Sequence, residues 1–234
     1  MNERPDHEEQ GGAPPMAGMA VYRTPPPPAA WAGADVVRIV DPLGLAIAWV
    51  APAVAGACIG FSVREDTASP WRSVFESDIP NDDAPLGIEP LVRLDDGTVV
   101  PARLAGMAWT MLERDPISVI ATCEDCLTPH TVAVTCEDGA MEFTLTGDGF
   151  AGARLLIPNA DIPSGPDESA SLSSQSNSAV LVAPDATLTL AWTADLTMSI
   201  FQAGAPHIDL HAVHGRPYLA PISIRLALRT STDT

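Results

Sequence analysis

The chain has 234 residues, 46% of them apolar, and its 12 basic residues against 30 acidic ones give a formal charge of -18. That charge repels phosphate backbones and anionic lipid, so we expect no nucleic-acid partner and no membrane-surface role. The first twenty residues lack the positive start and apolar core of a secretory signal, which predicts a cytoplasmic location. Four cysteines are too few for the disulfide framework of a small secreted protein.

Residues 1–34 are acidic and rich in proline, and they include the run Pro25-Pro26-Pro27-Pro28. Such a run favours an extended polyproline conformation without a packed core. We therefore predict a disordered tail over 1–34, followed by one domain over 35–230. A ligand for a domain that recognises polyproline is the functional alternative for the tail.

Residues 42–63 contain no charged side chain. Their length is enough for a membrane-spanning helix. However, the large side chains at Leu43, Leu45 and Ile47 alternate with small ones, which is the spacing of a strand. Pro52 would also cost a helix about 3 kcal/mol. We predict two strands joined by a turn, with a membrane-anchored domain as the alternative.

Further along the chain, short segments of alternating apolar residues predict strands. They cover 36–40, 117–123, 132–136, 141–145, 180–182, 187–193, 198–200 and 222–228. Asp138-Gly139 predicts a tight hairpin turn, because both residues tolerate positive φ. The spacing of apolar residues over 102–113 predicts a helix, and the polar stretch 161–178 predicts an exposed, flexible loop. Around ten strands with one short helix indicate an all-β, antiparallel β-sandwich.

Four residues have a spacing close to that of a zinc knuckle, C-x2-C-x3-H-x5-C: Cys123, Cys126, His130 and Cys136. Cys136 also continues the apolar stripe of Val132 and Val134, which would direct its sulfur into the core. We expect structural thiols and no bound metal, and keep zinc as the alternative.

His207, Asp209 and His211 alternate with Ile208 and Leu210, so on a strand the three polar side chains share one face. The two histidines would then lie about 13 Å apart, too far to bind one metal. They are our candidates for acid and base catalysis or for binding hydroxyl groups, and a solvated strand face is the alternative.

Three further residues are candidates for contacting a sugar: Trp71, Arg93 and Trp109. An indole ring can stack on the apolar face of a sugar ring, although buried tryptophans in strands are the alternative.

Three segments resemble the galactose mutarotase-like, or aldose 1-epimerase, superfamily over about residues 36–150. Residues 49–61, WVAPAVAGACIGF, are similar to its opening hairpin; 70–75, PWRSVF, to the segment after it; and 90–93, PLVR, to its Pro-Leu-Val element. The resemblance implies a β-sandwich, complete or shortened, with a carbohydrate-related function. The family's Asn-Arg pair, His-Pro-Tyr element and late glutamate have no counterpart here, so it assigns no catalytic residue.

The sequence therefore predicts a sandwich that binds a sugar or acts as an aldose epimerase, opening and reclosing a pyranose ring by acid-base transfer without a cofactor. A non-catalytic structural or interaction subunit is the alternative function.

Overall fold

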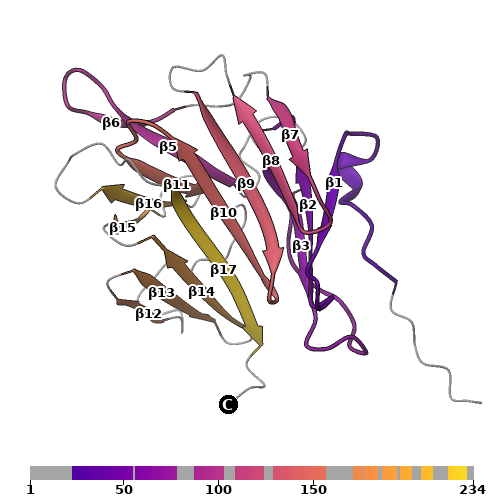
Figure 1. Ribbon diagram of the computed structural model, residues 1–234. Coiled ribbons are helices and arrows are strands. Elements are labelled where there is room, and N and C mark those ends of the chain that lie inside the picture. The colour runs from indigo at the N-terminus through magenta and orange to yellow at the C-terminus, as the bar shows by residue number, and fades with distance from the viewer. Residues whose placement is uncertain are drawn as a thin grey trace, which may run out of the picture.

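The structure, a computed structural model, describes residues 23–54, 56–77, 87–102, 109–123, 129–156, 171–175, 177–183, 186–193, 196–201, 207–212 and 221–230. Within these ranges the chain forms three antiparallel sheets and one short 3-10 helix, η1 (Ala29–Trp31). Figure 1 shows the long strands β9, β10 and β17 running side by side, with β1, β2 and β3 to one side of them.

The sheets have four, eight and five strands. The first has the order β1-β2-β3-β4, with bounds Val37–Val40, Ala46–Ala51, Ala57–Val63 and Arg72–Glu76. The second has the order β12-β13-β14-β17-β10-β9-β8-β7, with bounds Ser171–Gln175, Ser178–Ala183, Ala186–Trp192, Ile222–Thr230, Ala140–Gly147, His130–Glu137, Ser118–Cys123 and Thr110–Arg114. The third has the order β15-β16-β11-β5-β6, with bounds Leu196–Phe201, His207–Ala212, Gly152–Leu156, Gly87–Arg93 and Val99–Pro101.

One apolar core joins the three sheets. Its buried side chains include Val134 and Phe143 of the eight-stranded sheet, Ile39 and Cys58 of the four-stranded sheet, and Ile88, Leu155 and Leu210 of the five-stranded sheet. Each buried Leu, Ile or Phe contributes about 1.5–3 kcal/mol relative to an exposed one. The predicted all-β, antiparallel β-sandwich is therefore confirmed.

The uncharged run 42–63 forms the predicted pair of strands. β2 pairs with β3 from Ala46↔Val63 to Ala51↔Ala57, with a register shift at Trp49/Val50. The helical membrane span considered for this run is wrong, because strands occupy it. Over the ranges that the structure describes, no helix has the length and apolar character needed to cross a bilayer.

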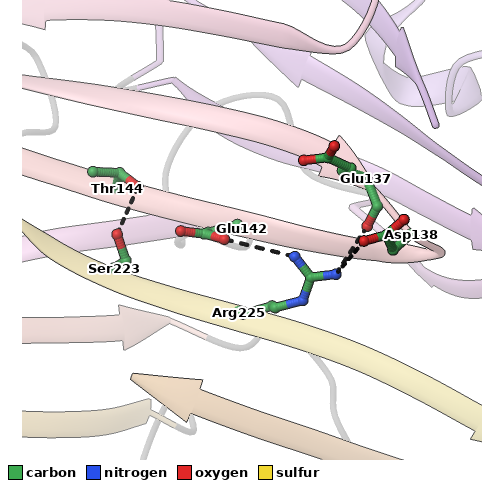
Figure 2. A network of polar contacts seen from close by, with 6 residues as sticks. All are labelled: Glu137, Asp138, Glu142, Thr144, Ser223 and Arg225. Atoms are coloured by element: carbon green, nitrogen blue, oxygen red, sulfur yellow. Dashed lines mark hydrogen bonds and ion pairs between the residues drawn. The ribbon is translucent and has the colours of Figure 1, made fainter. Parts of the chain in front are cut away.

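The predicted turn between β9 and β10 is also confirmed. Asp138 and Gly139 have φ values of 52° and 68°, as a two-residue turn of this kind requires. Arg225 of β17 reinforces it: the guanidinium donates to the carbonyl oxygen of Glu137 at 3.2 Å and lies 3.7 Å from carboxylate oxygens of Asp138 and Glu142 (Figure 2). This contact lies on the face of the eight-stranded sheet that points away from the core.

The helix predicted over 102–113 is wrong where the structure describes it. Residues 110–114 form β7, an edge strand that pairs with β8 from Thr110↔Thr122 to Arg114↔Val119. Residues 103–108 lie outside the described ranges. Met111 and Leu112 are exposed, so the spacing that indicated a helix did not mark a buried face.

Two other predictions need correction. The polar stretch 161–178 is not a loop throughout, because β12 pairs with β13 from Ser171↔Val182 to Gln175↔Ser178; residues 161–170 and 176 lie outside the described ranges. Small serine side chains can occupy a strand, and the polar composition concealed this. In the tail, Trp31 is only 4% exposed, so ordered structure begins before residue 35; residues 1–22 lie outside the described ranges.

Candidate functional site

The predicted catalytic segment lies on β16, which pairs with β15 on one side and β11 on the other. Leu210 belongs to the main core, so the neighbouring positions Asp209 and His211 lie on the opposite face of the strand. Among the side chains that the structure describes, five charged or titratable ones lie on this face of the five-stranded sheet and define what we call the polar face: Glu89, Arg93, Arg154, Asp209 and His211.

The central contact of the polar face is a two-pronged ion pair between Arg154 and Asp209. These residues are opposite one another in the β11–β16 register. Arg154 Nε donates to Asp209 Oδ1 at 2.7 Å, and Arg154 Nη2 donates to Oδ2 at 2.9 Å. The Asp209 side chain is 5% exposed and that of Arg154 is 21% exposed. Such paired, charge-assisted bonds fix the guanidinium plane as well as its position.

The same cross-strand row extends to β5. Glu89 is opposite Arg154 in the β11–β5 register, and its charge acts on the guanidinium. The pKa of Arg154 is raised above its ordinary value, first by the hydrogen bonds to Asp209 and further by the charges of Asp209 and Glu89. Arg154 therefore stays positively charged between two strands that each present a carboxylate.

His211 lies in the adjacent row, opposite Gly152 of β11, and its side chain is half-buried. Two residues of strand place it about 7 Å from Asp209 along β16. A Cβ on Gly152 would overlap the carbonyl oxygen of Leu210, so only glycine fits there. Consequently no side chain of β11 stands between His211 and Leu91, the next residue in the row, and both Gly152 and Leu91 are buried.

Arg93 is the one sugar-contact candidate that the structure brings to the polar face. It lies two positions beyond Leu91 on β5, hence on the same face, where it is exposed and donates to the Gly97 carbonyl oxygen at 3.0 Å. Trp71 and Trp109 lie elsewhere. Trp71 precedes β4 and has the Arg64 guanidinium 4.4 Å from its ring centroid; Trp109 precedes β7 in the eight-stranded sheet.

His207, the third candidate from the segment, pairs with Leu156 of β11 and Phe201 of β15. Its side chain lies outside the described part of the structure. Four residues of strand separate it from His211, so the strand geometry that predicted about 13 Å between them holds.

The zinc-knuckle alternative does not fit the strand geometry. His130 and Cys136 lie on β9 six residues apart, which is about 20 Å along a strand and too far for one metal ion. His130 is instead buried in edge contacts with Trp109 and Phe150, with ring centroids 5.3 and 6.1 Å away. Cys126 lies outside the described ranges, and within them no three metal-binding side chains are grouped.

Cys136 lies in the core, as the apolar stripe of β9 predicted. Burial raises the pKa of its thiol to about 12, with a smaller contribution from the charge of Asp41. Burial also raises the pKa of the Cys58 thiol, whose sulfur donates to the Gly60 carbonyl oxygen at 3.2 Å. These thiols are structural parts of the core.

Arg154 was not among the sequence candidates, and it is the residue that organises the polar face. The only signal was a single arginine inside the otherwise apolar strand GARLL, paired in space with a single aspartate inside HIDLHA. A charge within an apolar strand needs a partner, but the sequence does not say which one.

Comparison with known proteins identified no family model and no curated protein that matches the chain. Solved structures do match. A candidate aldose 1-epimerase from Escherichia coli is similar over 83% of this chain and 99% of its own, with 10% sequence identity and a TM-score of 0.50. The Slr1438 protein from Synechocystis sp. PCC 6803 is similar over 90% of this chain and 100% of its own, with 7% identity and a TM-score of 0.51. The chain therefore has a fold like that of these proteins, as its resemblance to the aldose 1-epimerase superfamily predicted.

Proposed function

We propose that the chain binds a sugar on the polar face of the five-stranded sheet. The observation that carries this proposal is the Arg154–Asp209 ion pair, a fixed guanidinium on a face that also presents His211 and Glu89. The fold is consistent with it, because one of the similar solved structures is described as a candidate aldose 1-epimerase.

The chemistry of the polar face suits hydroxyl groups. Two nitrogens of the Arg154 guanidinium bond Asp209, and the remaining N–H groups can donate to a ligand oxygen. Glu89 can accept hydrogen bonds from hydroxyls, and an imidazole can donate from one ring nitrogen and accept at the other. Adjacent hydroxyls of a pyranose need this combination of donors and acceptors.

For a catalytic form of this function, we assign proton transfer to His211 and a positioning role to Asp209. Both oxygens of Asp209 accept hydrogen bonds from Arg154, which leaves the carboxylate poorly placed to take a proton from a ligand. An imidazole can accept and release a proton near neutral pH. In the reaction, a base removes the proton of the anomeric hydroxyl, an acid protonates the ring oxygen, and the bond from C1 to that oxygen breaks. Rotation of the aldehyde and the reverse steps give the other anomer.

A second candidate is a non-catalytic interaction subunit, favoured by the edge strand β7. All five of its residues are exposed, including Met111 and Leu112, and it pairs with β8 alone among the strands described. An exposed edge with apolar side chains can accept another strand.

Two measurements on the full chain test the proposal. Calorimetric titration with a panel of aldoses measures binding, and polarimetry of a freshly dissolved pure anomer measures the rate of its conversion to the other anomer. We expect saturable heat for at least one aldose. If the protein is an epimerase, the H211A variant should slow the optical change by about 100-fold or more while keeping most of the affinity. Absence of both heat and rate across the panel contradicts the sugar proposal and favours the interaction subunit.

A further inference from the structure

Residues 23–34, which we call the N-terminal strap, contact the face of the four-stranded sheet that points away from the main core. Trp31, in η1 at the centre of the strap, is 4% exposed and packs with Ala51 of β2 and Ile59 of β3. Its indole nitrogen donates to the carbonyl oxygen of Ser77 at 3.1 Å. These residues form a small apolar cluster separate from the main core.

The proline run of the strap also contacts the sheet. A Cβ on Gly60 would lie 3.1 Å from Cγ of Pro28 and 3.6 Å from Cδ1 of Trp49, so Pro28 lies over a bare stretch of β3 beside an indole ring. Pro28 is buried, with φ −52° and ψ 137°, which are polyproline values. Because this conformation has three residues per turn, Pro25 lies on the same side as Pro28, and it is half-buried.

A surface made of an aromatic ring and a glycine backbone resembles the aromatic-lined surfaces that bind polyproline segments in other proteins. Such surfaces also supply donors for the free carbonyl oxygens of the ligand, since a polyproline helix has no internal hydrogen bonds. Trp49 offers one: its Nε1 is buried, and no described residue accepts a hydrogen bond from it. The strap thus covers this surface without supplying an acceptor for Trp49 Nε1 from its described residues, and a buried donor without an acceptor is unfavourable.

We propose that this face, built on Trp49, Ile59 and Gly60, is a binding surface for a proline-rich segment followed by tryptophan, and that the chain's own strap occupies it reversibly. The polyproline run is then a ligand that binds to a surface of the same chain. Gly33, near the end of the strap, has φ +90° and no atom within 4 Å of where its Cβ would stand, so the chain can change direction there. This proposal does not depend on sugar binding.

The test uses the full chain and a fluorescent synthetic peptide with the sequence of residues 23–34, followed by anisotropy. The W31A chain, whose own strap is held less tightly, should bind the peptide at least about tenfold more tightly than the unaltered chain, because the attached strap competes for the same surface. A peptide with alanine in place of Trp31 is the matched control ligand. The G60V/W31A chain, whose added side chain meets Pro28, should not bind.

Hydrogen exchange of the unaltered chain gives a second readout. The backbone N–H groups of Trp31, Ala32 and Ala34 donate within the strap, at 2.9, 3.2 and 3.1 Å. They should exchange through a local opening well before the amides of β9 and β10. Each of four results would overturn the proposal. Two concern peptide binding: equal affinity of W31A and G60V/W31A, or no binding by W31A at millimolar peptide. The other two are an unfolded W31A chain and amide exchange of the strap only through global unfolding.

Discussion

Arg154 and Asp209, 55 residues apart in sequence, meet on neighbouring strands and share two hydrogen bonds of 2.7 and 2.9 Å. The pair ties β11 to β16 on the face opposite the main core. It gives Asp209 a different role from the acid or base that the sequence predicted, because its carboxylate holds the guanidinium in place.

Replacing one residue of this ion pair should lower the free energy of unfolding by more than replacing both residues. D209L leaves the guanidinium with Glu89 as its remaining carboxylate and should lower the free energy of unfolding by about 2–4 kcal/mol, below the loss for a fully buried pair because Arg154 is partly exposed. The D209L/R154M double variant should lie within about 1 kcal/mol of the unaltered chain. Urea unfolding of the unaltered chain, D209L, R154M and the double variant measures this. Equal losses for the single and double variants would contradict a structural ion pair.

Much of the fold could be predicted from local pattern. The alternation over 42–63 indicated β2 and β3, and Asp138-Gly139 indicated the turn between β9 and β10, because both signals depend on residues close in sequence. The strand at 110–114 could not be recognised in this way. It is an exposed edge strand, and its sequence has no alternation of buried apolar side chains with exposed ones. Trp31 likewise has only small residues and prolines beside it in sequence, and its buried contacts come from Ala51 of β2 and Ile59 of β3.

The residues of the candidate site were in part sequence candidates, and their roles stay predictions. Asp209 and His211 were candidates because their segment alternates polar and apolar residues, and Arg93 was a candidate for contacting a sugar. Arg154 was missed because its importance depends on the β11–β16 register, which no local pattern specifies. Trp71 and Trp109 precede strands of the other two sheets, and a tryptophan's residue type does not say which sheet it joins.

Asp41 allows a test of how much a hydrogen bond to a buried carboxylate contributes to stability. It is 2% exposed; its Oδ2 accepts from the backbone N–H of Leu45 at 2.9 Å, and its Oδ1 has no hydrogen-bond partner among the described residues. D41N keeps the acceptor and removes a buried charge, so it should change the free energy of unfolding by less than about 1 kcal/mol. D41A also orphans the Leu45 N–H and should cost about 1–3 kcal/mol.

Thermal and urea unfolding of both Asp41 variants give the comparison. A loss for D41N as large as the loss for D41A would contradict this account, because it would show that the charge of Asp41, and not the acceptor for the Leu45 N–H, stabilises the fold.

The buried thiols predict a loss of stability at alkaline pH. The folded chain raises the pKa of Cys136 to about 12 from an ordinary value of 9.0, and raises that of Cys58 as well. Above pH 9 the cysteine thiols of the unfolded chain lose their protons, which lowers the free energy of the unfolded state, while the buried thiols of the folded chain keep theirs. The stability is therefore fully present below pH 9 and falls as the pH rises toward 12, by up to about 1.4 kcal/mol per pH unit for each thiol.

Urea midpoints between pH 8 and 11, compared for the unaltered chain, C58A and C136A, isolate this effect, since each variant should have a shallower slope. Identical slopes in all three chains would mean that other groups govern alkaline unfolding.

The central claim, that a sugar binds on the polar face, is tested most directly by comparing two arginines that each contact carboxylates on strands. Arg154 lies on the polar face, whereas Arg225 contacts Asp138 and Glu142 on the outer face of the eight-stranded sheet (Figure 2). Calorimetric titration with the best aldose should show that R154M weakens binding by about tenfold or more, the loss of a charge-assisted hydrogen bond, while R225M leaves it unchanged. Unchanged affinity in a folded R154M chain, or an equal loss in R225M, would contradict the proposed site.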